Sequence, residues 1–530
     1  MIEPPTRKSP DDLHIIPRPL RLTTTGGSYT LAQADPITFH GPGSEDLALL
    51  LAEYLRPATG MEFPVVSSEA PAGCGIHVVT RTNPPPDDAG FQEEDYTCRV
   101  SETGIVLDAQ TPAGLARAIQ TFRQILPVKI FSKSLEPGPW PVPCLSIDDK
   151  PRFRWRGMHL DVARHFFSVE AVCRFIDLAA LHRFNVCHLH LTDDQGWRLE
   201  IKKYPRLTEV GAWRSQTLLG HEYDRPRRYD ARPYGGFFSQ EEMKTIIAFA
   251  ARRQVTIVPE IEMPGHAQAV IAAYPELGCK PSGVEVRCHW GISQHVLNVE
   301  DSTVAFFKDV LDEVVELFPS KFIHIGGDEA PKSEWGESPS VQFRMAERGI
   351  LSENELQSWF VRQMLEHLAT RGRRLIGWDE ILEGGLPDGA SVMSWRGEEG
   401  GRKAAEAGHD VVMAPYQWVY FDHHQAEPIR EEPIGFEGTI TTEHVYAYEP
   451  VPSAFPEGCA GHILGAQGQL WSEYIPTVEH LDYMAFPRAC ALAEVLWLPK
   501  EELKYSRFLA DLACHRGRLA ALGVRPHPRP

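Results

Sequence analysis

After residue 150 the sequence repeats one pattern, in which a short apolar segment of strand type is followed by a longer segment with helical spacing. The helical segments include 168–184, 239–254 and 302–318, and Ser239 with Glu242 forms the capping box expected at a helix start. Eight segments fit the strand pattern: 156–161, 185–192, 255–261, 322–325, 374–378, 391–395, 410–414 and 462–467. Eight such units in about 350 residues are what a (β/α)8 barrel requires. The sequence therefore predicts an α/β protein built on a TIM barrel.

The proline-rich stretch 137–143 separates this region from what precedes it, because proline continues neither a helix nor a central strand. The earlier residues mix both element types, with helices predicted at 46–55 and 112–126, a strand at 75–80, and a hairpin of 96–100 with 104–108. Such a mixture predicts a small α+β domain without visible catalytic residues. We therefore divide the chain into a structural domain over 1–150, a catalytic barrel over 151–500, and a helix within 501–530 that packs on the barrel.

The net charge of the chain is −19, from 53 basic and 72 acidic residues. Such a protein is poorly suited to nucleic acid or to an anionic membrane, so a neutral or cationic small molecule is the expected partner. No apolar run approaches the roughly 18 residues of a membrane span, and the first 30 residues lack a signal-peptide core. As given, the sequence predicts a cytoplasmic protein, and an exported protein is the alternative if a signal was removed. Oligomeric state is left open, with a homodimer as one alternative.

The ten cysteines are scattered singly and form no Cys-x-x-Cys pair, which predicts buried apolar residues rather than a metal or redox site. We therefore expect no metal and no cofactor. Cys279 and Cys288 bracket a turn-rich segment that a disulfide could close, but their spacing alone leaves this question open.

Polar and aromatic side chains follow nearly every predicted barrel strand at its C-terminal end, the face where barrels of this type carry active sites. The first four strands are followed mainly by charged residues, namely Arg164, then Asp193 and Asp194, then Glu260, Glu262 and His266, then Asp328 and Glu329. The last four contribute mostly aromatic residues: Trp378 with Asp379 and Glu380, Trp395, Tyr420 with Asp422, and Trp471 with Glu473. This distribution predicts one pocket that combines carboxylates with aromatic rings.

The fourth strand ends in Gly326-Gly327-Asp328-Glu329, two glycines and two adjacent carboxylates. Carboxylates at the end of a buried strand are costly unless something binds or reacts there, so chemistry is the better interpretation of this pair. The aromatic residues indicate a sugar, because the apolar C–H faces of a pyranose pack on indole rings while its hydroxyls need polar partners. The sequence thus predicts a carbohydrate site with acid chemistry.

These segments resemble the family 20 glycoside hydrolases, which are β-N-acetylhexosaminidases. The resemblance covers about residues 90–500 and lies in four motifs: LDVARHF at 160–166, HLHLTDDQGW at 188–197, PEIEMPGH at 259–266 and GGDE at 326–329. It implies a small α+β domain before the barrel and an exo-acting enzyme that releases terminal N-acetyl-β-D-hexosamine with retention. The mechanism implied is substrate-assisted catalysis through an oxazolinium intermediate. Preference for GlcNAc or GalNAc and the natural aglycone stay open.

The resemblance also implies roles for individual residues. Glu329 is the general acid, which protonates the leaving oxygen and later activates water. Asp328 holds the 2-acetamido N–H and offsets the charge that develops as the acetamide oxygen attacks the anomeric carbon. Because neighbours on a strand point to opposite sides, we expect the two carboxylates to address different parts of one sugar. Asp193 and His266 match a supporting pair behind the acid, which would help to keep Glu329 protonated.

Two further groups of residues are implied to hold the sugar. The first clamps the acetamide with three indole walls and one hydroxyl donor: Trp378, Trp395, Trp471 and Tyr420. The second binds hydroxyls at a closed end of the pocket: Arg164, Glu473 and Asp422. Glu262 departs from the family pattern, since many relatives carry Asp there, and only a supporting role is assigned to it.

Two other classes of function are weighed against this one. His188 and His190 are similar to the paired strand-end histidines that ligate zinc in some barrels, as in a metal-dependent amidohydrolase. The simpler interpretation is core histidines that face packing or a neighbouring helix. A non-catalytic sugar-binding protein would keep the aromatic residues, but the intact Asp328 and Glu329 speak against it. The long segment 195–238, rich in Arg and Tyr, is interpreted as solvated surface, with a loop that overhangs the pocket as the alternative.

Overall fold

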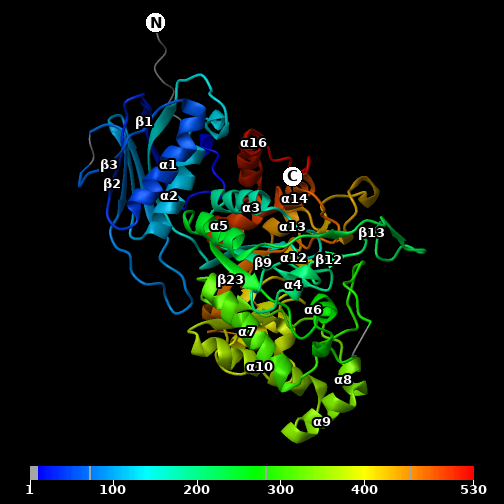
Figure 1. Ribbon diagram of the computed structural model, residues 1–530. Helices are drawn as coiled ribbons and strands as arrows, with labels where there is room; N and C mark the ends of the chain where they lie inside the picture. The colour runs from blue at the N-terminus through cyan, green and yellow to red at the C-terminus, as the bar shows by residue number, and fades with distance from the viewer. Residues whose placement is uncertain (1–9, 71–72, 281–282, 454, 457) are drawn as a thin grey trace.

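The computed structural model describes residues 10–530 except 71–72, 281–282, 454 and 457. The chain forms two units, an N-terminal sheet with two helices and a larger barrel with helices around it (Figure 1). Within this described part of the chain, no helix has both the length and the apolar composition that a bilayer crossing requires.

In the described residues of the N-terminal unit, seven strands form one mixed sheet in the order β1-β7-β5-β6-β4-β2-β3. Their bounds are β1 Arg21–Thr30, β2 Ile37–His40, β3 Val65–Ser67, β4 Ile76–Thr80, β5 Tyr96–Ser101, β6 Gly104–Ala109 and β7 Pro141–Asp149. Helices α1 (Ser44–Thr59) and α2 (Pro112–Ile125) bury apolar side chains in the same core. Thr111 caps α2 by accepting a hydrogen bond from Gly114 N. The predicted small α+β domain and its β5–β6 hairpin are confirmed.

The second unit is a closed barrel whose strands run in chain order around the ring, β8-β9-β16-β17-β18-β19-β20-β23, with β23 beside β8. Every neighbouring pair is parallel. The strands are β8 Trp155–Asp161, β9 Val186–His190, β16 Thr256–Glu260, β17 Phe322–His324, β18 Arg374–Trp378, β19 Ser391–Ser394, β20 Val411–Met413 and β23 Ile463–Gly468. Each of the eight predicted strand segments contains or overlaps one of these strands, so the (β/α)8 prediction is confirmed.

Helices cover the outside of the barrel (Figure 1). The longer ones are α3 Val169–Leu181, α5 Gln240–Ala251, α7 Asp301–Leu317, α9 Pro339–Arg348, α10 Glu353–Thr370, α11 Glu399–Glu406, α14 Val478–Ala485, α15 Arg488–Trp497 and α16 Tyr505–Ala521. The capping box at the start of α5 is present, with Ser239 and Glu242 each bonding the other's backbone N–H. The helix expected within 501–530 is α16, which begins at Tyr505 after a separate 3-10 turn at residues 500–502.

The last helix joins the two units, a contact that the sequence analysis did not predict. Helix α16 packs on the barrel core through Phe508 and Leu512 and also touches the short turn η2 (Val128–Phe131) of the N-terminal unit. Arg518 donates a hydrogen bond to the backbone oxygen of Gln124 in α2 at 2.7 Å. The C-terminal segment therefore fixes the N-terminal domain against the barrel.

The interior of the barrel below the pocket contains a buried polar cluster. Glu260 on β16 lies 2.6 Å from His190 Nδ1, 3.1 Å from His188 Nε2 and 2.9 Å from His324 Nδ1. His188 and His190 thus face the barrel interior, which confirms the interpretation as core histidines and excludes the neighbouring helix as their surroundings. Glu260 likewise lies inside the barrel and does not line the pocket. From there it supports the pocket from below.

Candidate active site

Ten of the eleven residues to which the sequence analysis gave a catalytic or binding role line one cavity. They are Arg164, His266, Asp328, Glu329, Trp378, Trp395, Tyr420, Asp422, Trp471 and Glu473. The cavity volume is about 320 Å³, which lies at the small end of the range for small-molecule sites. The eleventh residue, Asp193, lies behind the cavity wall in contact with His266 and Arg164.

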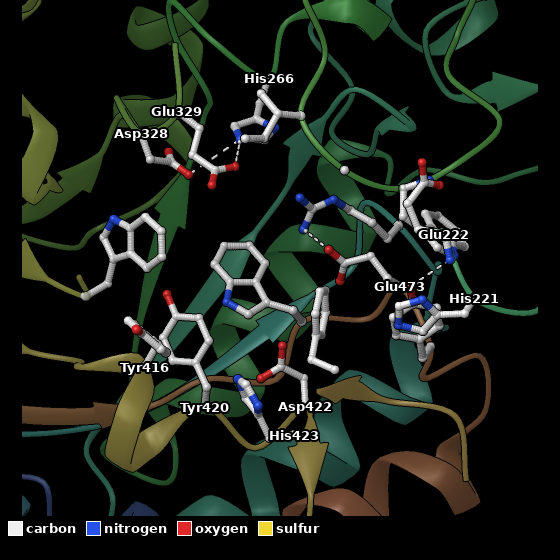
Figure 2. A pocket seen from close by; sticks show the side chains of 18 of the residues that line it. His221, Glu222, His266, Asp328, Glu329, Tyr416, Tyr420, Asp422, His423 and Glu473 are labelled. Atoms are coloured by element: carbon white, nitrogen blue, oxygen red, sulfur yellow. Dashed lines mark hydrogen bonds and ion pairs between the residues drawn. The ribbon is translucent and has the colours of Figure 1, made fainter. Parts of the chain in front are cut away.

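Asp328 and Glu329 lie in the loop after β17 rather than on the strand. Gly326, Gly327 and Glu329 have φ values of 66°, 95° and 45°, so the chain turns sharply at the pair. The expectation that the two side chains alternate as on a strand is therefore wrong. The Nε2 atom of His266 lies 3.5 Å from Asp328 Oδ2 and 3.4 Å from Glu329 Oε2, so both carboxylates face one imidazole (Figure 2).

The loops that carry these groups come into close backbone contact. A Cβ atom on Gly265 would lie 2.9 Å from the backbone oxygen of Asp328, so a side chain there would force the loops apart. His266 itself has a φ of 46°, and positive φ values in non-glycine residues store strain that often marks functional sites. The close packing therefore places the imidazole of His266 beside the two carboxylates.

His266 connects the carboxylate pair to a buried anion behind the pocket. Its Nδ1 lies 3.1 Å from Asp193 Oδ1, and Arg164 lies 2.9 Å from the other oxygen of the same carboxylate. Burial lowers the pKa of His266, but Asp193 raises it well above its usual value. Burial raises the pKa of Asp193, but Arg164 and His266 hold it well below its usual value. At neutral pH we therefore expect a cationic His266 beside the acid pair.

Four aromatic side chains form the pocket wall on the other side: Trp378, Trp395, Tyr420 and Trp471. The rings of Trp395 and Tyr420 stack with centroids 6.2 Å apart, and Trp378 lies 5.8 Å from Trp471. Buried carboxyl groups fix two of the indoles, since Trp378 Nε1 donates to Glu260 at 2.7 Å and Trp395 Nε1 donates to Glu380 at 2.9 Å. The wall is thus held in place before any ligand binds.

Arg164, Glu473 and Asp422 lie together at one end of the pocket (Figure 2 labels the two acids). Arg164 lies 3.7 Å from Glu473 Oε1, and burial raises the pKa values of Glu473 and Asp422 to about 7. Among the described residues, Glu473 Oε2 and Asp422 Oδ1 are buried without a hydrogen-bond partner. Such acceptors are costly unless a ligand supplies donors, and sugar hydroxyls are donors of this kind.

The pocket also contains residues that the sequence analysis did not find: His221, Glu222, Tyr223, Trp290, Gly291, Ile292, Tyr416, His423, Phe436 and Tyr474. The rings of His221 and Tyr474 stack at 5.0 Å, and Glu222 N donates to Tyr474 Oη at 3.2 Å. Tyr474 directly follows Glu473 and His423 directly follows Asp422, and residues 221–223 belong to the segment that was weighed as an overhanging loop, so these positions carried a signal in the sequence. The others lie on separate loops that meet only when the chain folds.

The segment 195–238 borders the pocket through the turn at 221–223, which supports the overhanging loop rather than a purely solvated surface. One of the arginines that drew attention to it, Arg227, forms an ion pair with Glu222. Cys279 and Cys288 are both free thiols. The disulfide that the spacing allowed is therefore not formed.

Histidine and carboxylate groups that could hold a metal occur in and below the pocket, including the His188, Glu260 and His324 group. His190 is not suited to ligate zinc, because its Nδ1 bonds Glu260 at 2.6 Å and its Nε2 bonds Asp193 at 2.8 Å. The carboxylates Glu260 and Asp193 raise the pKa of His190 to about 10, although burial alone lowers it. A protonated imidazole has no lone pair for a metal. His190 therefore does not fit the ligand role that the zinc amidohydrolase alternative assigns to it.

Comparisons with known protein families give two matches that cover most of the chain. Residues 153–500 match the model described as glycosyl hydrolase family 20, catalytic domain, and residues 12–150 match glycosyl hydrolase family 20, domain 2. A β-hexosaminidase of Porphyromonas gingivalis is 41% identical over 97% of this chain, and the match spans 64% of that relative's length. A β-hexosaminidase of Vibrio furnissii is 36% identical over 91% of this chain and 76% of its own.

Solved structures with the same fold include close overall matches. The GH20 β-N-acetylhexosaminidase of Streptomyces coelicolor superposes with a TM-score of 0.83 at 30% identity, covering 98% of both chains. A mutant β-hexosaminidase of Streptomyces plicatus in complex with its product, GlcNAc, gives a TM-score of 0.84 at 30% identity and covers 100% of this chain and 99% of its own.

Proposed function

Because the chain belongs to glycosyl hydrolase family 20, we propose that it is an exo-acting β-N-acetylhexosaminidase that uses the substrate's own acetamide as the nucleophile. The observation that carries this proposal is the cavity of about 320 Å³, in which Asp328 and Glu329 share one wall and four aromatic rings form another. We assign catalysis to residues 151–500, and a structural role to 1–150 and to the helix within 501–530.

In the first step Glu329 protonates the glycosidic oxygen as the bond to the anomeric carbon breaks. The acetamide oxygen attacks the same carbon from the opposite face and forms an oxazolinium ring, so no enzyme atom joins the sugar. Asp328 accepts the acetamido N–H and offsets the positive charge that spreads onto this group. A fixed anion at that point stabilises the transition state more than the ground state, where the charge is absent.

In the second step Glu329, now a carboxylate, takes a proton from water, and the water opens the oxazolinium ring. Two displacements at one carbon retain the β configuration. His266 Nε2 lies 3.4 Å from Glu329 Oε2, so a cationic imidazole offsets the negative charge that Glu329 carries once it has given up its proton.

The aromatic wall and the closed end position the sugar. Trp378, Trp395 and Trp471 surround the acetamide, and Tyr420 donates a hydrogen bond to its oxygen, so the nucleophile is held near the carbon that it attacks. Arg164 and the unpartnered oxygens of Glu473 and Asp422 bind the hydroxyls. A pocket end at which these groups bind the hydroxyls of the terminal sugar fits release of a terminal residue.

Hydrolysis of an aryl N-acetyl-β-D-glucosaminide, followed by proton NMR from the start of the reaction, tests the proposal. We expect the β anomer of N-acetylglucosamine to appear first and the α anomer to follow only by mutarotation. First appearance of the α anomer would mean one direct displacement by water. No hydrolysis at all would favour a sugar-binding protein.

Replacement of Asp328 by Asn is expected to lower kcat by more than it raises KM. Asn keeps the size of the side chain but lacks the negative charge, which is needed only when the acetamide becomes cationic. Removing one such electrostatic group from other enzymes lowers kcat by about 10²- to 10³-fold. Steady-state kinetics on the same aryl substrate measures both constants. A change confined to KM would contradict the assigned role.

A further inference from the structure

Glu262 is a buried carboxyl group to which the proposed mechanism gives no task. It follows β16 by two residues, is 1% exposed, and its backbone N donates to Thr192 Oγ1 at 2.8 Å. Among the described residues, neither of its carboxyl oxygens has a hydrogen-bond partner. Among the described residues, the nearest basic nitrogen is His190 Nδ1, which lies 3.9 Å from Glu262 Oε1 and already bonds Glu260. A buried anion in this position would be poorly compensated.

The carboxyl group of Asp328 is also incompletely hydrogen-bonded. Its Oδ1 is buried and lacks a hydrogen-bond partner in the described part of the chain, while its Oδ2 faces His266. Glu262 and Asp328 are close enough to influence each other directly, because each carboxyl group shifts the pKa of the other. When both are ionised they offer only acceptors to one another, so the contact is repulsive. One proton placed between them would replace this repulsion by a hydrogen bond.

Gly326 makes this contact sterically possible. A Cβ atom on Gly326 would lie 1.7 Å from Glu262 Oε2, so any side chain there would displace the carboxyl group. Gly326 has a φ of 66°, a conformation that glycine adopts without strain. Gly326 thus leaves free the space that the Glu262 carboxyl group occupies beside the loop of Asp328.

We propose that Glu262 is a protonated carboxylic acid in the working protein and that it donates a hydrogen bond to Asp328, which keeps Asp328 ionised and fixed in orientation. Glu262 is then a positioning residue, because it acts on the sugar only through Asp328. That consequence for catalysis rests on the proposed function, whereas the protonation itself does not.

The surroundings decide which partner keeps the proton. Charged and titratable groups face Glu262 from several elements: Asp328, Glu260, His266, Asp193 and His190. Burial, then Asp328 and Glu260, raises the pKa of Glu262 well above its usual value. Burial raises the pKa of Asp328 only to about 6, since His266 counteracts the effect. Glu262 therefore holds the proton at neutral pH and Asp328 carries the charge.

Infrared difference spectroscopy tests the protonation without any substrate. The spectrum of the wild-type protein minus that of Glu262→Gln, recorded near pH 7, should contain the C=O stretching band of a protonated carboxylic acid, and the band should shift in D2O. The control Glu337→Gln changes an exposed carboxylate and should show only the bands of an ionised group. Absence of the acid band from the Glu262 difference spectrum would overturn the proposal.

Kinetics test the positioning role with two variants of similar size. Gln can donate the same hydrogen bond, so Glu262→Gln should keep more than a tenth of the wild-type kcat. Met cannot donate, so Glu262→Met should lose about 10- to 100-fold in kcat with a smaller change in KM. Equal losses, or none in either variant, would contradict the role. If the wild-type protein does not hydrolyse the aryl substrate, the proposed function is wrong. The infrared band still shows whether Glu262 is protonated, because that measurement needs no substrate.

The pH dependence of stability provides a check that a misfolded variant cannot imitate. In the unfolded chain the Glu262 carboxyl group has a pKa near 4.5 and releases its proton above that pH, whereas the folded protein keeps the proton there. The stabilisation from this proton is present below that pH and is lost as pH rises toward the folded-state pKa. Glu262→Gln removes the effect, so its melting temperature relative to wild type should rise with pH. A constant difference would contradict the proposal.

Discussion

Replacement of Glu329 by Gln is expected to lower kcat on an alkyl or disaccharide N-acetyl-β-glucosaminide by about 10²- to 10⁴-fold, the usual contribution of a general acid. Gln has the same shape but no proton to give to the leaving oxygen. Because the replacement leaves the proposed contacts of Trp378, Trp395 and Tyr420 with the sugar unchanged, KM should change much less than kcat. Steady-state kinetics with released-sugar detection measures both.

The leaving group provides an internal control for this assignment. A dinitrophenyl aglycone departs without protonation, so its cleavage should suffer far less from Glu329→Gln than that of a disaccharide. The matched variant Glu337→Gln changes an exposed carboxylate on the neighbouring helix α8 (Ser333–Glu337) and should behave like wild type. Equal losses for good and poor leaving groups would remove Glu329 from the role of acid.

Removal of the 2-acetamido group from the substrate is expected to have a still larger effect. An aryl β-D-glucoside should be cleaved at least about 10⁴-fold more slowly than its N-acetylglucosamine counterpart, because a positioned intramolecular nucleophile is worth effective molarities of 10⁵ to 10⁸ M. Asp328 and Glu329 lie in one loop and face the same imidazole of His266. The two carboxylates are therefore not arranged on opposite sides of the sugar, where a second one could replace the missing nucleophile.

A matched pair of substrates with the same aglycone measures this difference. The two substrates are compared by kcat/KM, which includes any weaker binding of the plain glucoside. The separate KM values then show how much of the difference is due to binding. Comparable rates on the two substrates would show that the protein supplies its own nucleophile.

The barrel could be predicted from the sequence because its signals are local. Each strand is a short apolar run, and each helix carries its own spacing and cap, as Ser239 and Glu242 show at α5. The order of strands around the ring then follows from the parallel βα pattern. The positions of ten pocket residues followed from one rule, namely that side chains after strand ends meet at one face.

The rest depended on contacts that the sequence does not display. The predicted placement of Asp328 and Glu329 on the strand itself was wrong, because β17 ends before them and positive φ values redirect the chain. His188 and His190 alternate correctly along β9, but only barrel closure reveals that their partner is Glu260 across the interior. Pocket residues such as His221 and Trp290 belong to loops whose meeting point is set by tertiary packing.

The central claim is that the acetamide of the substrate performs the displacement, and substitution on that acetamide tests it most directly. Fluorine atoms on the acetyl methyl group withdraw electrons from the carbonyl oxygen and weaken it as a nucleophile, while the group stays almost the same size. We expect kcat/KM on aryl glucosaminides to fall steadily with each added fluorine. Rates that stay constant or rise along this series would contradict the account.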